Sequence, residues 1–518
     1  MSQPTQPQQG HGPAPVTAPA GVRRAVVVGG GVSGLLAAYR LSADGVAVTL
    51  VEARPVLGGA VRSHTVGGLT LDSGAESFAT RGDAIPALLK DLGLDQDVVA
   101  PHPSGAWVRL PQGPRELPKT GVLGIPADPW DEEVRRTLGW AGSLRASLDR
   151  VLPGNLGAGA DVSSVARLVR LRQGRRVLKR LVEPVVGGVH AADPGLLDVD
   201  MVAPGLRKRM REHGSLGAAV LAQRQSARTV PGDADRNGAP RRAGSAVAGL
   251  RGGMHRLVET LEAHVREAGA RVLTSAAARP VSRDADGVWT IPVEHDGAVE
   301  TLRAEHLVVA LDGPAAVELL ASQVPALAAH RPEPGAQIKL VTLVVDQPEL
   351  DARPRGTGIL VAPQTQGVQA KALTHATAKW PWLAEAAGPG VHVLRLSYGR
   401  QDGAPGQNTE SSAVGAAPES DEELFQAALA DASELLGVPL AADDVLDYDV
   451  VRWSGALPFA AVGHRQRVAA VRELCAAEPG LDVVGAWLAG TGLAAVVADT
   501  LKIFTGAGSG SGQGPSRA

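Results

Sequence analysis

The sequence predicts an α/β protein in which both ends of the chain join in one domain with a buried parallel sheet. Near the start, the apolar run Ala25–Val28 precedes the glycine turn 29–34 and a helix, and Ala47–Val51 is a second apolar run. Short continuous apolar runs are typical of strands covered on both faces. Near the end, the glycine-rich segment 485–492 precedes the apolar Leu493–Leu501. This pattern indicates a further strand, turn and helix.

Composition limits the classes of partner. A chain of 518 residues with 44% hydrophobic and 20% charged residues is typical of a soluble globular protein of two to three domains. A net charge of −3 gives no general attraction to nucleic acid, and no nucleic-acid partner is expected. The single cysteine, Cys475, excludes an intrachain disulfide and a multi-thiolate metal site, so no metal is expected. We interpret Cys475 as an ordinary helical thiol, the alternative being a covalent or redox role.

The first glycine turn predicts a Rossmann-like dinucleotide site. Gly29 allows the tight turn, Gly31 lets backbone N–H groups approach a pyrophosphate, and Gly34 lets the helix pack on the strand. The N-terminus of the helix adds a partial positive charge. Glu52 follows the second strand about 20 residues on, where a carboxylate accepts hydrogen bonds from ribose hydroxyls.

A second glycine pair and the far end of the chain indicate which dinucleotide binds. Gly58 and Gly59 stand between Arg54 and Arg62 and offer further backbone donors to a pyrophosphate. The helix after Gly492 could point its N-terminus at the edge of a flavin ring where negative charge builds on reduction. A cofactor bound by both ends of the chain must be long, which favours FAD over NAD.

The rest of the chain divides by composition into further segments. We predict disordered tails at residues 1–22 and 506–518 and mobile insertions near 224–245 and 401–420. The FAD-binding domain takes residues 23–90, 251–312 and 451–505. The substrate-side domain takes residues 91–250, which are largely helical, and 313–450. Within 271–311, the segments 271–274, 287–293 and 301–303 alternate like a small sheet, and the buried run 307–311 then returns the chain to the nucleotide domain. The apolar segment Val483–Ala498 is too short to span a membrane.

Several longer motifs match one family. With them in view, the chain resembles the protoporphyrinogen/coproporphyrinogen oxidase family of FAD enzymes in haem synthesis, from about Arg24 to Leu501. The motifs are Leu71–Phe78, Gly124–Pro126, Val182–Ala191, Leu250–Met254, Lys371–His375, Lys379–Trp382, Leu396–Arg400, Arg452–Trp453, Ala456–Pro458, Gly463–His464 and Gly490–Leu493. Two positions depart from the pattern: Ala494 replaces a usual proline, and His190 replaces a frequent tyrosine.

The resemblance implies an activity. A porphyrinogen loses six electrons in steps of two, a hydride passes to flavin N5, and oxygen reoxidises the flavin and yields hydrogen peroxide. No side-chain base is assigned. The coproporphyrinogen branch is the closer match, with protoporphyrinogen oxidation as the alternative. The family also implies a cytoplasmic enzyme with peripheral contact with a membrane and transfer of its product to a haem-pathway chelatase.

The site residues follow from the motifs and the resemblance together. Coproporphyrinogen carries four propionates, so its site should contain cations. Arg81 is the first candidate, and His190 and Lys379 are weaker ones, each with an ordinary structural role as the alternative. The predicted cofactor-binding residues are Gly29, Gly31, Val32, Ser33, Gly34, Glu52, Ala53, Arg54, Gly58, Gly59, Arg62, Gly74, Ala75, Glu76, Val281, Trp453, Gly490, Gly492 and Leu493.

Three further alternatives stay open. Trp380 and Trp382 could wall a flat substrate or lie in the core. The basic run Arg167–Arg180 is interpreted as a solvated helix face, with contact to a membrane surface or an acidic substrate as the alternative. The whole chain could instead be a carotene desaturase, an amine oxidase or a non-catalytic flavin-binding protein.

Overall fold

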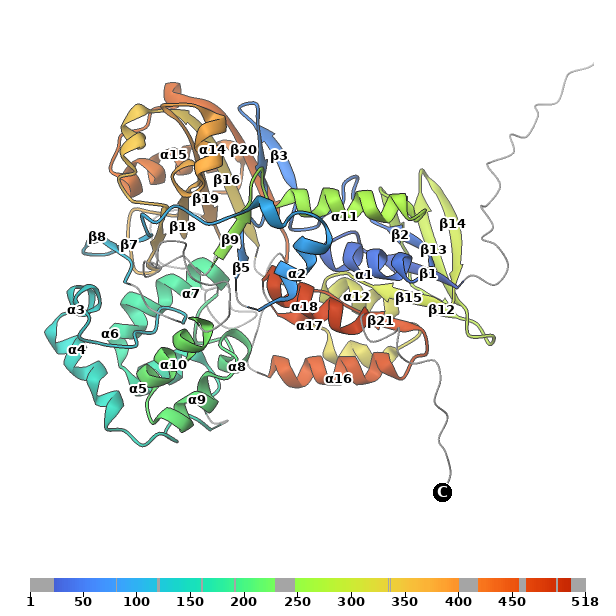
Figure 1. Ribbon diagram of the computed structural model, residues 1–518, viewed down its shortest axis with the longest axis horizontal. Coiled ribbons are helices and arrows are strands. Elements are labelled where there is room, and N and C mark those ends of the chain that lie inside the picture. Colours follow the sequence, from blue (N-terminus) through green and yellow to red (C-terminus); the bar gives the residue numbers. More distant parts are fainter. Residues whose placement is uncertain are drawn as a thin grey trace, which may run out of the picture.

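The computed structural model describes most of the chain. The described residues are 23–80, 82–118, 122–159, 162–190, 192–228, 247–333, 335, 337–399, 418–455, 463–490 and 492–504, without the side chains of 189, 190 and 226–228. The two predicted tails and most of the two predicted insertions therefore lie outside the described residues. Figure 1 shows a nucleotide-side body on the right, a mixed-sheet body at upper left and a helical body at lower left.

The nucleotide-side body is built on a five-stranded parallel sheet with strand order β10-β2-β1-β15-β21. Its strands come from the beginning, the middle and the end of the chain, which confirms that both chain ends enter one domain. They are β1 (Arg24–Val28), β2 (Ala47–Val51), β10 (Arg271–Leu273), β15 (His306–Val309) and β21 (Leu481–Val483). Because all five run parallel, their carboxyl ends meet at one edge of the sheet.

Both faces of this sheet are covered, as the apolar runs predicted. On one face, Val27 packs with α1 (Val32–Ala43), α2 (Ala84–Asp91), α11 (His255–Glu267) and α18 (Leu493–Phe504). On the other face, Val26 and Val28 pack with α12 (Gly313–Leu320), η4 (Pro325–His330), α16 (His464–Ala476) and α17 (Ala486–Ala489). Residues 313–330 thus pack with the nucleotide-side core, although the sequence division placed them in the substrate-side domain.

One prediction about residues 271–311 is wrong. The segment at 271 does not join the small sheet but forms β10, which pairs with β2 at the edge of the parallel sheet. Alternation of polar and apolar residues fits both the edge of the parallel sheet and the small antiparallel sheet. A strand in either place is partly exposed. The small antiparallel sheet consists of β11 (Ala276–Ala278), β12 (Ser282–Arg283), β13 (Trp289–His295) and β14 (Ala298–Ala304).

The mixed-sheet body carries seven strands. Their order is β20 (Val445–Trp453), β16 (Ile338–Asp346), β19 (Val391–Tyr398), β18 (Ala372–His375), β17 (Gly358–Val361), β7 (Trp107–Leu110) and β8 (Gly113–Glu116). Helix α15 (Asp421–Leu436) packs on one face, and its N-terminus is closed by a capping box between Ser420 and Glu423. The short helices α13 (Ala376–Lys379) and α14 (Pro381–Ala387) and the 3-10 turns η5 (Pro348–Ala352) and η6 (Ala442–Asp444) complete this body.

Short strands join this body to the parallel sheet. The hairpin of β3 (Ser63–Val66) and β4 (Leu69–Asp72) packs on the mixed sheet, where the Gly67 N–H donates to Asp447 and His64 bonds Asp449 over 2.6 Å. Beyond it, β5 (Phe78–Ala79) and β6 (Val98–Val99), with η1 (Asp95–Asp97) just before β6, pair on either side of β9 (Val247–Leu250). The segment that leaves the dinucleotide turn therefore reaches the substrate side within a few residues.

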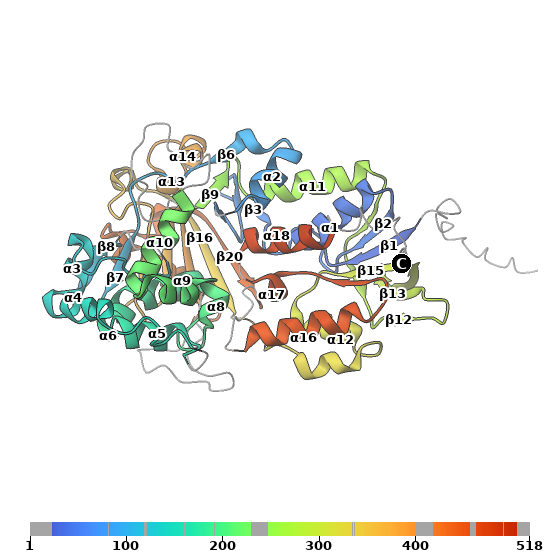
Figure 2. The same ribbon diagram turned by 60° about the horizontal axis from the view of Figure 1, so that its bottom comes forward.

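The helical body has an apolar core of its own. It contains α3 (Glu132–Leu138), α4 (Trp140–Ser147), η2 (Leu148–Arg150), α5 (Val165–Arg172), α6 (Arg175–Val177), the π-helix η3 (Leu178–Val182), α7 (Glu183–His190), α8 (Val199–Val202), α9 (Leu206–His213) and α10 (Leu216–Arg228). Figure 2 shows these helices together at one end of the molecule. Across the described ranges, no helix combines the length and apolar character needed to cross a membrane.

The basic run on α5, α6 and η3 is not simply a solvated face. The Arg172 side chain is fully buried, and its Nε donates to Asp149 over 2.5 Å. Its other nitrogens donate to the carbonyls of Pro153, Asp149 and Gly214. Arg176 and Arg180 donate to carbonyls at the end of α3. The solvated-face interpretation is therefore wrong for Arg172, which fastens the core of the helical body.

The buried Arg172–Asp149 pair gives a stability prediction. We expect Asp149→Ala to destabilise the protein by about 3–5 kcal/mol, because it leaves the Arg172 guanidinium buried without a counter-charge. Urea unfolding followed by far-ultraviolet circular dichroism measures this change. Arg136→Ala is the matched control: its ion pair with Glu132 is exposed, so its loss should cost less than about 1 kcal/mol. Equal effects of the two substitutions would contradict the prediction.

Candidate cofactor and substrate site

The first glycine turn lies where β1 ends and α1 begins. Gly29 has φ +108°, and a Cβ there would lie 2.4 Å from the Ala310 carbonyl oxygen. A Cβ on Gly34 would lie 1.8 Å from the Gly29 carbonyl oxygen, so the helix can approach the strand only because residue 34 has no side chain. Gly31 differs, because a Cβ there would meet only Gly59, at 4.0 Å. Its side faces space that a ligand can use.

The N-terminus of α1 is free to bind an anion. Gly31 is the N-cap residue and provides no side-chain cap, and the first turn contains no acidic residue. Val32 and Ser33 follow in that turn and are buried. The backbone N–H groups of a first helical turn have no partner within the helix and carry partial positive charge. The turn therefore has the donors that a pyrophosphate requires.

The second glycine pair lies directly against the first turn. Gly58 forms a parallel bridge with Gly31, and its N–H donates to the Gly30 carbonyl over 2.8 Å. Gly58 and Gly59 both have positive φ, and a Cβ on Gly59 would lie 3.3 Å from the Gly31 Cα. The two predicted donor segments thus meet backbone to backbone, which glycine with positive φ at positions 58 and 59 allows.

The predicted ribose acid lies at the same turn. Glu52 follows β2, and its carboxylate accepts hydrogen bonds from the N–H groups of Gly30 (2.7 Å) and Arg54 (2.9 Å). Ala53, also a predicted cofactor residue, lies between Glu52 and Arg54 in the sequence. At the neighbouring strand end, the Glu52 carbonyl accepts from the Ala276 N–H. The carboxylate therefore lies at the carboxyl edge of the sheet, and its contact with a ribose stays a prediction.

Arg62 has an unpaired donor that fits an anionic ligand. Its guanidinium lies 4.6 Å from the centre of the Trp453 ring, and its Nε is buried without a hydrogen-bond partner in the described structure. Burial lowers the pKa of Arg62, and the nearby Arg54 lowers it further. A half-buried cation with a buried, unused donor, next to two glycine turns, fits the phosphates of FAD. We infer that the residues present suit the predicted cofactor.

The end of the chain returns to this core. Gly490 and Gly492 have φ of +98° and +109°, and no heavy atom lies within 4 Å of a Cβ at either position. Leu493 begins α18, packs against the cluster around α1, and is followed by a first turn without acidic residues. A second helix start without acidic residues in its first turn thus belongs to the same body as the first. Thr491 lies outside the described residues.

A buried ion cluster lies on the substrate side of the site. The Glu76 carboxylate accepts from Lys379 Nζ (2.5 Å) and from Arg395 Nη1 (2.8 Å), and Arg395 Nη2 donates to the Gly74 carbonyl (2.8 Å). Burial acts to raise the pKa of Glu76, but the two cations lower it to about 2. Glu76 is therefore ionised throughout the physiological range and fastens β5 to β19 and α13.

This cluster changes the expectations for two residues. Lys379 has an internal carboxylate partner in this structure, so it does not stand free for a substrate propionate. Arg395 was missed by the sequence reasoning, although a charged residue inside the apolar strand β19 was a usable signal. The neighbouring Gly74 needs to be glycine, because a Cβ there would lie 2.1 Å from the Ala60 carbonyl oxygen. The Ala75 N–H donates to that same carbonyl over 2.9 Å.

A second cluster that the sequence did not predict lies at the start of α11. Asp72 accepts from the N–H groups of Met254 (2.9 Å) and His255 (3.0 Å) and lies 3.1 Å from His255 Nδ1. The hydrogen bond to Asp72 raises the pKa of His255. Gly252 and Gly253 before a helix were the sequence signal for this contact. The cluster joins two of the family motifs, those at 71–78 and at 250–254.

The positions of the remaining predicted residues say less about the site. Arg81 lies outside the described residues, and the His190 side chain is not described. Val281 is fully buried in the apolar cluster under the sheet, where its N–H donates to the Leu319 carbonyl, so its contact with the cofactor stays a prediction. Trp453 donates its Nε1–H to the Ser73 carbonyl over 3.1 Å.

The alternatives that the sequence left open have structural answers. Trp380 is buried and Trp382 is partly buried, both in the apolar cluster beside the hairpin, which is the core interpretation. Cys475 is buried in α16, and burial raises the pKa of its thiol to about 11. A protonated buried thiol is a poor nucleophile, which agrees with its interpretation as an ordinary core residue.

Comparison with known proteins agrees with this geometry. Residues 32–501 match the family described as flavin containing amine oxidoreductase. The coproporphyrinogen III oxidase of Mycobacterium leprae is 32% identical over 91% of this chain and 95% of its own length. That of Propionibacterium freudenreichii is 30% identical over 92% and 88%. The crystal structure of a candidate protoporphyrinogen oxidase from Exiguobacterium sp. 255-15 matches with a TM-score of 0.74 and 25% identity over 94% of this chain and 98% of its own.

The glycine geometry predicts a difference between two alanine substitutions. Gly31→Ala should fold normally but bind FAD at least about tenfold more weakly, because its methyl group enters the space available to the pyrophosphate. Gly34→Ala should instead lower the yield of folded protein, because its Cβ would overlap backbone. Fluorescence titration of flavin-depleted protein and thermal unfolding measure the two effects. A Gly31→Ala protein with unchanged FAD affinity would show that the space beside residue 31 is not the phosphate site.

The low pKa of Glu76 predicts a pH-dependent contribution to stability. Because the folded-state pKa of about 2 lies below the ordinary 4.5, the stabilisation is fully present above pH 4.5 and is lost as the pH falls toward 2. Glu76→Gln should therefore unfold at a lower temperature than the wild type at pH 7. The difference between the two unfolding temperatures should narrow as the pH falls from 4.5 toward 2. Calorimetry of both proteins measures this difference. A difference that does not depend on pH would contradict the low pKa of Glu76.

Proposed function

Because the chain belongs to the flavin containing amine oxidoreductase family and is an FAD enzyme, we propose that it oxidises coproporphyrinogen III to coproporphyrin III. The similarity to coproporphyrinogen III oxidases over nearly the whole chain carries this proposal. That similarity extends through the glycine turns at both ends and through the substrate-side segments between them. An amine oxidase, a carotene desaturase or a non-catalytic flavin protein is thereby less well supported.

The residues of the chain would act mainly by binding and orientation. When bound, FAD accepts a hydride from a saturated bridge carbon of the substrate. The first turn of α1 and Arg62 would hold the pyrophosphate, and Glu52 would hold a ribose. The start of α18 would place positive partial charge at the flavin edge that becomes negative on reduction. The Glu76–Arg395 pair would fix the backbone of Gly74, a predicted cofactor-binding residue.

Aromatisation of the macrocycle drives the reaction, so no strong general base is needed and none is assigned. Removal of six electrons takes three rounds of two. We propose that oxygen accepts each pair and leaves as hydrogen peroxide, one molecule for each round. The predicted cytoplasmic location, peripheral membrane contact and product transfer to a chelatase stay predictions.

Substrate choice depends on the number of propionates. Coproporphyrinogen carries four carboxylates and protoporphyrinogen two, so a site for the former needs more cations. Arg81 directly follows the segment that contains Glu76, and we retain it as the first propionate partner, with His190 as a further candidate. Since Lys379 is held by Glu76, it would act on a propionate only through that pair. The similarity to a candidate protoporphyrinogen oxidase keeps the dicarboxylate substrate as the alternative.

Initial rates on the two substrates test the proposal. We expect kcat/KM for coproporphyrinogen III to exceed that for protoporphyrinogen IX by at least about tenfold, as expected for added charge-assisted contacts. Arg81→Ala should lower kcat/KM for coproporphyrinogen and leave the flavin absorbance spectrum unchanged. Porphyrin fluorescence, corrected for spontaneous oxidation, measures the rates. Preference for the dicarboxylate would overturn the substrate assignment, and loss of FAD from Arg81→Ala would show that this residue binds the cofactor.

A further inference from the structure

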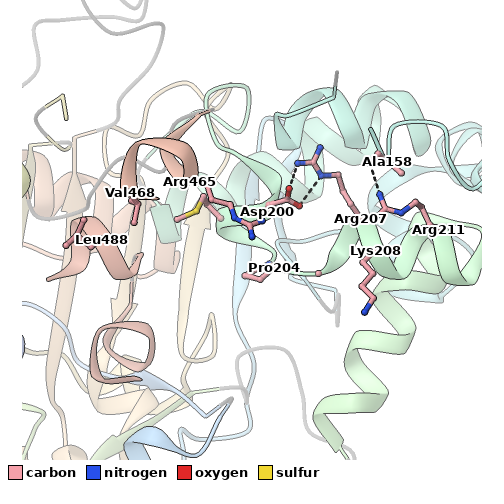
Figure 3. A pocket seen from close by; sticks show the side chains of 11 residues that line it. Ala158, Asp200, Pro204, Arg207, Lys208, Arg211, Arg465, Val468 and Leu488 are labelled. Atoms are coloured by element: carbon pink, nitrogen blue, oxygen red, sulfur yellow. Dashed lines mark hydrogen bonds and ion pairs between the residues drawn. The ribbon is translucent and has the colours of Figure 1, made fainter. Parts of the chain in front are cut away.

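A groove separates the helical body from the nucleotide-side body. Its volume is about 650 Å³. One wall comes from α8 and α9 with Met201, Lys208 and Arg211, and the other from α16 and α17 with Arg465, Val468 and Leu488. Figure 3 shows the two walls facing each other, with Arg465 reaching toward the α8 side. Of the predicted cofactor and substrate residues that the structure describes, none lines this groove.

Each wall carries an arginine, Arg211 on one and Arg465 on the other, that has no carboxylate partner among the described residues. Arg211 donates one hydrogen bond, to the Ala158 carbonyl over 3.0 Å. Within the described ranges, neither Arg211 nor Arg465 has a carboxylate at ion-pair distance. Lys208 is mostly exposed, and its nearest carboxylate, Glu212, is 3.9 Å away.

The remaining cation of the groove, Arg207, already has a carboxylate partner. Arg207 forms a two-point ion pair with Asp200, with Nε donating over 3.0 Å, and also donates to the Gly159 carbonyl. Figure 3 shows this pair as the dashed lines between Arg207 and Asp200. Asp200 is therefore held by Arg207 and leaves the positive charge of Arg211 and Arg465 uncompensated.

Apolar surface lies between these cations. Met201 and Pro204 on the helical side face Val468 and Leu488 on the other. An apolar centre with cations on opposite walls complements a molecule with an apolar body and carboxylates at its edge. A small inorganic anion would leave the apolar surface unused, and a neutral apolar ligand would leave the cations unused.

We propose that this groove is a second binding site, which holds the tetracarboxylate porphyrin product outside the reaction site. The assignment rests on the proposed function, since it identifies the ligand with the reaction's own product. A porphyrin with four propionates has a flat apolar ring and peripheral carboxylates, and the groove volume lies within the range of small-molecule sites. Product held here stays on the enzyme without blocking the next substrate.

Equilibrium dialysis of the FAD-loaded enzyme against coproporphyrin III tests the proposal. The wild type should bind a second porphyrin per chain, and the double variant Arg211→Ala/Arg465→Ala should bind it at least about tenfold more weakly. Initial kcat/KM for coproporphyrinogen should be unchanged in the variant, because the groove is not the reaction site. Arg209→Ala is the matched control, a cation on the same helix that does not line the groove.

Distinct outcomes contradict the groove and the proposed function. If the wild type and the double variant are both active and bind porphyrin equally, the groove is not the second porphyrin site. Displacement of the second porphyrin by benzenehexacarboxylate at equal affinity also overturns it, because the site would then select charge alone. Absence of turnover in the wild type contradicts the proposed function instead. If the double variant does not fold, Arg465→Gln carries the same comparison.

Discussion

Close backbone packing at one edge of the parallel sheet determines where the cofactor site forms. The turn after β1, the segment at Gly58 and the end of β15 approach each other so closely that side chains at Gly29 or Gly34 would overlap backbone atoms. This packing brings the N-terminus of α1 and the Glu52 carboxylate to one place. Since β1, β15 and β21 come from three distant parts of the chain, the site forms only when the whole domain has assembled.

The substrate side is tied to that edge by buried charge rather than by apolar packing alone. Glu76 and Arg395 link β5 to the mixed sheet, and Trp453 at the end of that sheet lies over Arg62. Removing one partner of such a pair costs more than the pair contributes, because the other charge stays buried. The arrangement therefore specifies how the mixed sheet is placed against the cofactor turn. The same logic applies to Arg172 and Asp149, which fix the helical body.

The sequence predicted the parts of the site that depend on local geometry. The order of strand, glycine turn, helix, strand and acid at 25–52 is a local pattern, and the structure has each element in place. Contacts between distant segments were not predictable in the same way. Lys379 and Arg395 were invisible as partners of Glu76, because nothing in one sequence shows that residues some 300 positions apart meet. The small strand β10 was misplaced because its pattern fits either sheet.

The assignment as a whole depends on electron transfer from a porphyrinogen to the bound flavin. Anaerobic mixing of the FAD-loaded protein with coproporphyrinogen III, followed by the absorbance of oxidised flavin, tests it most directly. We expect prompt loss of that absorbance together with the appearance of porphyrin fluorescence. Persistence of the oxidised flavin with coproporphyrinogen, and reduction only by an amine, would contradict it.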